Sequence, residues 1–313
     1  MKRAELEYSL PPELIAQHPT ERRDDSRLLV LQRTTGEIRH RRFRELPEEL
    51  AGELVVVNDT RVVSARLRLE RPGGGEAEVL LLEPLNGRGE WEGLARPTRR
   101  LVPGLRLGPV ELLEHLGEGR WRLRLEGAPQ GEAPLPPYIT EPLADPERYQ
   151  TVYADSEGSA AAPTAGLHFT PELLAKLDVE RVTLHVGLDT FRPVTAEELA
   201  DHPIHSERYE VASEAWERIG TAERVLAVGT TTVRVVESLA RAAPLAGRTD
   251  LFITPGFAFR RVDALLTNFH LPGSTLLALV MAFAGVEETR RLYELAIAKR
   301  YRFYSFGDAM LIL

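Results

Sequence analysis

A change of sequence texture in the middle of this 313-residue chain most constrains its fold. From Leu67 to about Pro137, short stretches that alternate apolar and charged residues are separated by glycine turns, as at 73–75 and 117–119. Five or six short strands of this kind are typical of a small barrel or sandwich. On both sides, apolar runs of strand length alternate with helical patterns, which is typical of an α/β domain. The sequence therefore predicts a discontinuous mixed α/β, barrel-like large domain (residues 1–66 and 150–313) with a small all-β barrel domain inserted at residues 67–149.

Local signals place several elements of the large domain. Residues 53–58 and 225–229 are continuous apolar runs that predict buried strands, and the second is expected to lead into a helix over 233–242. Ser274 is expected to cap a helix over 275–284 that Gly285 ends, and Thr170 to cap a helix with proline at its first position. We also expect a helix entered through proline at residues 10–15 and a helix start at the capping box 195–198. The proline-rich residues 129–142 are predicted to form a linker.

Composition excludes several kinds of site. The chain has no cysteine, which excludes disulfides, thiolate zinc sites, iron–sulfur clusters and a cysteine nucleophile, and which fits a cytoplasmic protein. The longest apolar run, residues 276–286, is too short to span a membrane, and no apolar signal region follows the N-terminus, so neither export nor membrane insertion is predicted. His202 and His205 flank Pro203 without the spacing of metal ligands on one helical face, so we predict no metal there.

Charge gives a mixed indication about nucleic acid. The net charge of −8 argues mildly against a general nucleic-acid coat protein. Nearly all of the positive charge is arginine, which is preferred for planar phosphate and base contacts, although codon bias or a heat-adapted source explains it as well. The basic residues 39–44 are either a phosphate-contacting segment, with Phe43 available for stacking, or a solvated charged face. The same two interpretations apply to Arg96, Arg99 and Arg100.

Five polar loop segments follow apolar runs, in the position where open α/β sheets bind ligands. These segments are residues 58–61, 162–169, 185–192, 229–234 and 267–274. The hydroxyl and amide groups of 229–232, at a predicted helix N-terminus, are expected to bind an anion or a ribose. Arg234 is either an anion clamp or the ion-pair partner of Glu237 on the same helix. The fingerprints of mononucleotide and dinucleotide sites are absent.

The combination and order of the sequence motifs resemble one family. The motifs are LPPELIAQ (10–17), RDDSRLL (23–29), VNDTRV (57–62), ERYQTVY (147–153), AAPTAGLHF (161–169), HSERY (205–209), TNFHLP (267–272) and YRFYSFGDAM (301–310). With them the chain closely resembles the S-adenosylmethionine:tRNA ribosyltransferase-isomerases of queuosine biosynthesis over essentially its whole length. Two departures stand out: Asp189 occupies a position where the family usually has glycine, and residues 140–142 lack the basic character common in the family.

The resemblance implies an enzyme that transfers and isomerises the ribosyl moiety of S-adenosylmethionine. The acceptor is 7-aminomethyl-7-deazaguanine at the wobble position of the tRNA anticodon loop, and the products are epoxyqueuosine-tRNA, adenine and methionine. S-adenosylmethionine is consumed as a substrate, so the resemblance implies no metal and no redox cofactor. We expect a cytoplasmic monomer without a membrane partner, since no exposed heptad seam is evident. The alternatives are a transferase acting on a small molecule and a binding module without catalysis.

The implied chemistry indicates which residues form the site. It needs a base near C5′ of the donor, hydrogen bonds to the departing adenine, and a clamp for the methionine carboxylate. We expect His168 or His270 to supply the base, with His185 and Asp59 as further catalytic candidates. The substrate-binding candidates are Asn58, Thr60, Arg61, Thr164, Gly166, Phe169, Gly187, Arg192, Thr230, Thr231, Arg234, Asn268 and Phe269. They are expected to meet in one cleft between the large domain and its insert.

Overall fold

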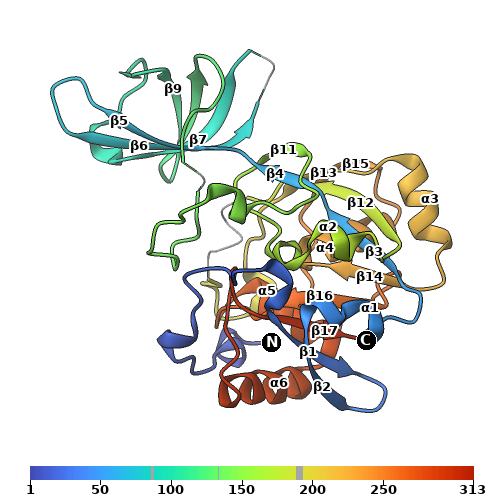
Figure 1. Ribbon diagram of the computed structural model, residues 1–313. Helices are drawn as coiled ribbons and strands as arrows, with labels where there is room; N and C mark the ends of the chain where they lie inside the picture. The colour runs from blue at the N-terminus through green and yellow to red at the C-terminus, as the bar shows by residue number, and fades with distance from the viewer. Residues whose placement is uncertain (86–87, 133, 188–192) are drawn as a thin grey trace.

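The computed structural model of the protein describes residues 1–85, 88–132, 134–187 and 193–313 (Figure 1). The described strands form sheets of nine, six and two strands. The strands of the nine-stranded sheet are β1 (Arg27–Gln32), β2 (Glu37–Arg42), β3 (Leu54–Asn58), β12 (Val179–Leu184), β13 (Glu207–Glu210), β14 (Val225–Val228), β15 (Ala246–Thr249), β16 (Ala264–Asn268) and β17 (Ala309–Ile312). The α-helices are α1 (Leu46–Glu49), α2 (Pro171–Leu174), α3 (Ser213–Thr221), α4 (Thr230–Leu239), α5 (Thr275–Ala284) and α6 (Val286–Ala298).

The nine-stranded sheet is mixed, in the order β15-β13-β12-β3-β14-β16-β17-β1-β2. Its centre, β12-β3-β14-β16, is parallel, whereas β13, β15, β17 and β2 add antiparallel pairs. Every residue of β3 is buried, because Leu54 and Val56 pack into a core with α3 to α6 while Val55 and Val57 pack into a second core on the other face. Burial on both faces explains the continuous apolar run at this position.

The six-stranded sheet is antiparallel and barrel-like, and it projects away from the large sheet (Figure 1). Its strands are β5 (Arg66–Glu70), β6 (Glu76–Pro84), β7 (Glu90–Arg96), β8 (Arg106–Leu107), β9 (Val110–Gly117) and β10 (Arg120–Leu125), in the order β5-β6-β7-β10-β9-β8. In β10 the residues Trp121, Leu123 and Leu125 point into a separate hydrophobic core while the arginines between them face solvent. The predicted fold class, mixed α/β with an antiparallel β unit, is confirmed.

Short strands β4 (Thr60–Val62) and β11 (Ser156–Ser159) pair in parallel where the chain enters and leaves the six-stranded sheet. This pairing fixes the base of the small sheet beside the end of β3. The remaining short helices are the 3₁₀ turns η1 (Arg3–Leu6), η2 (Pro12–Leu14), η3 (Arg23–Asp25), η4 (Phe43–Glu45), η5 (Thr98–Arg100), η6 (Pro146–Tyr149), η7 (Thr164–His168) and η9 (Leu199–Asp201).

The predicted helix caps are largely confirmed. Ser274 Oγ accepts a hydrogen bond from the Leu277 amide at 3.2 Å, and Gly285 ends α5 with a φ of 94°. Thr170 Oγ1 caps α2 in the same way through the Leu173 amide at 3.2 Å. Helix α4 begins at Thr230, three residues earlier than predicted, because Gly229 adopts a φ of 85° and turns the chain directly into the helix.

One predicted helix start is wrong, and one predicted helix is shorter than expected. No helix begins at Thr195; the chain forms η9 from Leu199, where the Leu199 amide donates to the Met1 carbonyl at 3.0 Å. The segment thus uses its backbone groups to hold the N-terminus of the chain, a contact that local sequence does not indicate. The helix expected at residues 10–15 is reduced to the single turn η2, because Ile15 pairs with Phe303. No helix in the described part of the chain is long and apolar enough to cross a membrane.

Candidate active site

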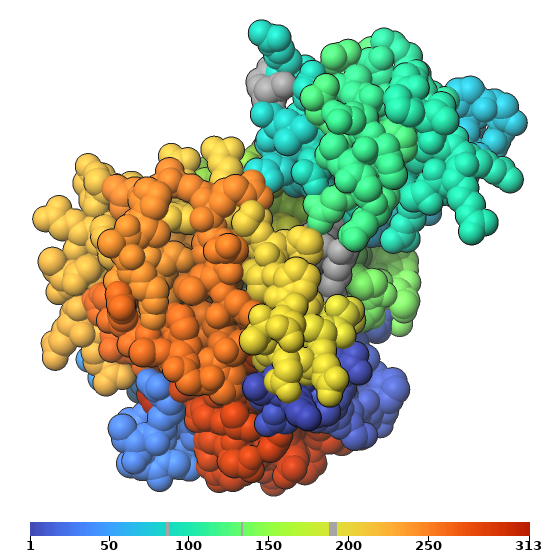
Figure 2. All heavy atoms as spheres, turned by 180° about the vertical axis from the view of Figure 1, so that it is seen from behind, coloured from blue at the N-terminus to red at the C-terminus, as the bar shows by residue number. Residues whose placement is uncertain are grey.

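A cavity of about 530 Å³ lies between the six-stranded sheet and the large sheet. Figure 2 shows this side of the molecule, where the small sheet stands above the segment near residue 200. The small sheet contributes residues of β5, β6, β7 and β10, and the large part contributes the ends of β12 and β13, the start of α4 and residues of α5. The volume lies in the usual range for small-molecule sites. Six arginines and four glutamates are among its described lining residues.

A second cavity of about 60 Å³ adjoins the first, on the side of α4. The two share Val186, Thr230, Thr231 and Leu276 in their walls. The small cavity is otherwise lined by residues 162–165 around the start of η7, by Gly229, by the end of β16 and the segment that follows it, and by Tyr138, Tyr304 and Ser305. Three of the five predicted segments (162–169, 229–234 and 267–274) therefore meet at the small cavity, and residues 185–187 line the large one.

His185 is the predicted catalytic residue that faces the large cavity. It follows β12, and its Nδ1 lies 2.9 Å from the Oγ1 of Thr60 at the start of β4. Burial, together with the Arg208 guanidinium, lowers the pKa of His185 below its usual range. The imidazole is therefore neutral at neutral pH, in the form that can accept a proton.

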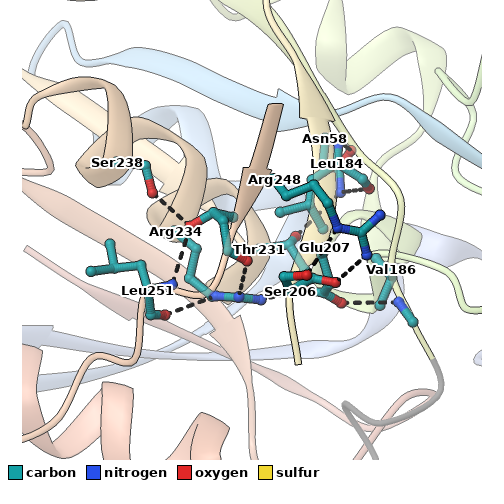
Figure 3. Close-up of polar contacts among 12 residues, drawn as sticks. Asn58, Leu184, Val186, Ser206, Glu207, Thr231, Arg234, Ser238, Arg248 and Leu251 are labelled. Carbon is teal, nitrogen blue, oxygen red and sulfur yellow. Dashed lines mark hydrogen bonds and ion pairs between the residues drawn. The ribbon is translucent and has the colours of Figure 1, made fainter. Parts of the chain in front are cut away.

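A buried ion pair ties β13 to α4 in the wall of the large cavity (Figure 3). The guanidinium of Arg234 pairs with the carboxylate of Glu207 and donates to the carbonyl oxygens of Leu251 at 3.0 Å and Thr249 at 2.9 Å. Glu207 also accepts the Gly187 amide at 2.9 Å. Arg234 of α4 is thus paired with Glu207 of β13, and the alternative of an Arg234–Glu237 pair on one helix is wrong.

Glu237 instead accepts the amides of residues 260–262 and an ion pair from Arg241, 2.5 Å away. Its carboxylate, fully buried, satisfies backbone groups of the chain that leads to β16. Glu237 lines neither cavity.

The N-terminus of α4 points to the junction of the two cavities. Gly229, Thr230 and Thr231 line the small cavity, and α4 has no side-chain cap on its first amides. Uncapped amides at a helix start favour a negatively charged group. Asn58 links the end of β12 to the start of α4. Its Nδ2 donates to the Leu184 carbonyl oxygen at 2.9 Å and to Thr231 Oγ1 at 3.3 Å. Asn58 is fully buried and lines neither cavity.

His270 and Asn268 line the small cavity with Thr164 and Phe269. His270 Nε2 lies 2.8 Å from Thr267 Oγ1, and burial lowers the pKa of His270 to about 3. Two tyrosines hold its backbone. The His270 amide donates a hydrogen bond to the Tyr293 hydroxyl at 3.0 Å, and the Tyr8 hydroxyl donates to the His270 carbonyl oxygen at 2.5 Å. His270 is therefore a rigidly held neutral histidine in the wall of the cavity.

His168 lies behind the small cavity and lines neither one. Its Nδ1 is 2.8 Å from Ser26 Oγ and its Nε2 is 3.1 Å from Asn268 Nδ2. Its ring packs on Phe43, with ring centroids 4.9 Å apart. Burial, followed by the charges of Arg302 and Arg23, lowers the pKa of His168 to about 3.

Five further predicted residues lie outside both cavity walls, namely Asp59, Thr60, Arg61, Gly166 and Phe169. Asp59 accepts a hydrogen bond from Thr183 at 2.6 Å, and burial raises the pKa of Asp59. Arg61 pairs with Glu147 at 2.9 Å. Gly166 and Phe169 are buried beside Tyr153. Arg192 and Asp189 lie outside the described residues, as does Phe191.

Several residues of the cavity walls had no predicted role. Glu207 belongs to a recognised motif, but nothing local indicates that its partner is Arg234, 27 residues away. Arg248 donates to Glu83 of the small sheet at 2.7 and 2.9 Å and so bridges the two sheets at the cavity. His202 and His205 also face the large cavity.

The basic segment 39–44 is mostly a paired surface. Arg39 and Arg41 both bind Glu49, at 2.7 and 2.6 Å, and Phe43 is fully buried. Phe43 therefore cannot stack on a nucleobase, and the solvated-face interpretation is favoured. Arg96 differs, because it is exposed and lines the large cavity.

Comparisons with known proteins give a consistent picture. Residues 3–312 match a family described as "Queuosine biosynthesis protein". The S-adenosylmethionine:tRNA ribosyltransferase-isomerase of Rubrobacter xylanophilus is 54% identical over 330 residues, covering 100% of this chain and 98% of the relative. That of Carboxydothermus hydrogenoformans is 52% identical over 339 residues, covering 100% of both chains. A crystal structure of an S-adenosylmethionine tRNA ribosyltransferase from Thermotoga maritima covers 99% of this chain and 100% of its own, with 39% identity and a TM-score of 0.57.

Proposed function

The chain belongs to the queuosine biosynthesis family of S-adenosylmethionine:tRNA ribosyltransferase-isomerases, and on this premise we propose the reaction that it catalyses. The ribosyl moiety of S-adenosylmethionine is transferred to the aminomethyl group of 7-aminomethyl-7-deazaguanine at the tRNA wobble position. The ribose is rearranged to an epoxycyclopentanediol, and adenine and methionine leave. The product is epoxyqueuosine-tRNA.

The observation that carries this proposal is the pair of joined cavities between the two sheets. The proposed donor has a nucleoside at one end and an amino acid at the other. The large cavity suits the nucleoside, and the adjoining small cavity suits the amino acid. The large cavity has apolar wall residues from both sheets, such as Leu80, Phe252 and Leu279, which suit the faces of a purine. The small cavity has mostly apolar walls, and the N-terminus of α4 supplies polar groups among them.

We assign His185 as the base that removes the C5′ proton of the donor. Hydrogens beside a sulfonium are acidic, so removal gives an ylide-like carbanion and leaves the proton on the imidazole. His185 fits because it lines the large cavity and is neutral. Thr60 fixes the ring through Nδ1, which leaves Nε2 as the basic nitrogen. His168 is too remote from either cavity for this role, and His270 is a weaker base with its lowered pKa of about 3.

No metal and no redox cofactor takes part in the proposed reaction, because the sulfonium itself activates the sugar. Adenine leaves with the electrons of its glycosidic bond and takes up a proton, which hydrogen bonds to its ring nitrogens assist. Methionine leaves with the electrons of the carbon–sulfur bond as a neutral thioether. The epoxide oxygen is one of the ribose oxygens.

Arg96, with Arg99 and Arg100 just after it, is the proposed contact for the phosphates of the anticodon loop. Arg96 lines the cavity and all three are exposed, so RNA phosphates beside a base in the cavity meet them at the rim. We propose a monomer as the active form. We propose the cytoplasm as the place of the reaction, because the proposed substrate is tRNA.

The proposal is tested by incubating the protein with S-adenosylmethionine and tRNA that carries 7-aminomethyl-7-deazaguanine. We expect release of adenine only when this tRNA is present, together with epoxyqueuosine in the digested RNA. Adenine release without RNA would instead indicate a small-molecule acceptor, and no release in either case would refute catalysis.

A matched pair of variants tests the base. His185→Gln should lower kcat by about 10²- to 10⁴-fold, the usual contribution of a general base. His115→Gln is the control, since His115 packs on Trp121 in the small sheet and lines neither cavity. Equal activity of the two variants would exclude His185 as the base.

A further inference from the structure

A chain of three side chains runs from the protein interior to the wall of the small cavity. Ser26 Oγ lies 2.8 Å from His168 Nδ1, and His168 Nε2 lies 3.1 Å from the amide nitrogen of Asn268. All three residues are buried, and only Asn268 lines the cavity. The proposed catalytic step uses neither His168 nor Asn268.

The carbonyl oxygen of Tyr304 fixes the orientation of the Asn268 amide. Asn268 Nδ2 lies 3.1 Å from this oxygen, which can only accept a hydrogen bond. The NH₂ group must therefore face Tyr304, and its second hydrogen points to His168 Nε2. His168 accepts at Nε2 and thus carries its proton on Nδ1, which donates to Ser26. A single arrangement of protons satisfies the whole chain.

This arrangement leaves the amide oxygen of Asn268 without a partner. No described residue donates a hydrogen bond to Asn268 Oδ1, although the side chain is 3% exposed. An unpaired buried acceptor is unfavourable, so a ligand that brings an N–H group to it gains affinity. The uncapped N-terminus of α4 lies in the wall of the same cavity and favours an anion.

We propose that the small cavity binds the amino-acid end of S-adenosylmethionine, with its α-ammonium group donating to Asn268 Oδ1 and its carboxylate at the N-terminus of α4. A zwitterionic head supplies both the N–H donor and the anion that this cavity accommodates. The cavity of about 60 Å³ suits such a head and is too small for a purine. His168 is a positioning residue that acts through Asn268. This inference rests on the proposed function, because it assigns one end of the proposed donor.

Binding of two compounds in the absence of tRNA tests the subsite. They are S-adenosylmethionine and its analogue without the α-amino group, each titrated calorimetrically into the whole protein. The wild type should prefer S-adenosylmethionine by about tenfold or more, as expected for a hydrogen bond to a charged donor. Asn268→Ala should bind the two compounds about equally. If Asn268→Ala keeps the preference of the wild type, the assignment of the α-amino group is wrong.

Variants of His168 distinguish positioning from proton transfer. His168→Leu should weaken S-adenosylmethionine binding and raise KM, while His168→Gln should restore most of the binding because its amide oxygen can accept from Asn268. A general base would lose kcat in both variants and change the pH profile. If His168→Gln loses kcat as strongly as His168→Leu with unchanged binding, the positioning role is refuted.

The control variant is His40→Gln. It removes a similar histidine–hydroxyl contact, 2.6 Å to Tyr301, that lies away from both cavities, and it should leave binding unchanged. Ser26→Ala gives a second measurement if His168→Leu does not fold, and it should weaken binding in the same direction by a smaller factor. Normal turnover by a wild type whose preference does not depend on Asn268 would refute this inference alone. A wild type that binds neither compound would refute the proposed function as well.

Discussion

Neutralising Glu207 tests whether the buried ion pair with Arg234 holds the cavity wall together. The side chains of Glu207 and Arg234 are 7% and 14% exposed, so each is largely removed from water. Glu207→Gln keeps the size of the side chain and can still accept the Gly187 amide, but it removes the charge that faces Arg234. The substitution therefore isolates the electrostatic part of the contact between β13 and α4.

The expected loss follows from the remaining partners. Removing one member of a buried ion pair costs roughly 3–5 kcal/mol when the other is left uncompensated. Arg234 keeps two carbonyl acceptors, Leu251 and Thr249, so we expect Glu207→Gln to lose about 2–3 kcal/mol of unfolding free energy. Arg234→Met should lose about 3 kcal/mol, because it removes the guanidinium that faces the buried Glu207 carboxylate. The double variant should lose little more than either single one, which gives a coupling energy of about 2 kcal/mol.

Urea unfolding of the four proteins, followed by circular dichroism, measures this coupling. The exposed pair Glu83–Arg248 is the matched control, since its side chains are 31% and 48% exposed. Glu83→Gln should cost less than about 1 kcal/mol, the usual contribution of a surface ion pair. If the losses of Glu207→Gln and Arg234→Met add in the double variant, the two residues are not coupled and the reasoning fails.

Four further results are expected. The kcat/KM of the wild type should fall as pH drops below the lowered pKa of His185, and His185→Gln should abolish that limb of the pH–rate profile. The pKa of His168 is about 3 in the folded protein and near 6.5 in the unfolded chain. The contribution of His168 to the unfolding free energy is therefore fully present above pH 6.5 and is lost toward pH 3, by at most about 1.4 kcal/mol per pH unit. Urea titrations at pH 7, 6 and 5 should show a smaller slope for His168→Gln. Arg96→Ala should weaken tRNA binding and reduce the slope of log K against log salt by about 1 in filter-binding assays, and an unchanged slope would exclude a phosphate contact. Gly166→Ala should lose about 1–3 kcal/mol by thermal denaturation, because its Cβ would overlap the Tyr153 hydroxyl, whereas Gly220→Ala in α3, with no atom nearby, should not destabilise the protein.

Sequence patterns predicted the elements whose causes are local. The apolar run of β3 reflects burial on both faces, and the alternation in β10 reflects burial on one. Ser274 and Thr170 cap helices through amides three residues away, so their neighbours suffice to identify them. The helix start expected at residues 195–198 was wrong, and the helix expected at residues 10–15 is a single turn, for the opposite reason. Both segments form backbone hydrogen bonds with residues far away in the sequence. The first segment pairs with Phe303, and the second binds the N-terminus of the chain.

In the site too, the sequence indicated the segments, whereas the role of each residue depends on contacts with distant residues. Motifs predicted five loop segments for the site, and three of them meet at the small cavity. They did not separate His168 from His270, since each histidine precedes a helix cap in a loop with glycine or proline. The difference lies in contacts across 142 residues to Ser26 and 100 residues to Asn268, which place His168 behind the cavity wall. A motif can thus require a histidine for the orientation of a neighbouring amide, and the role of such a residue follows from the partner of each ring nitrogen.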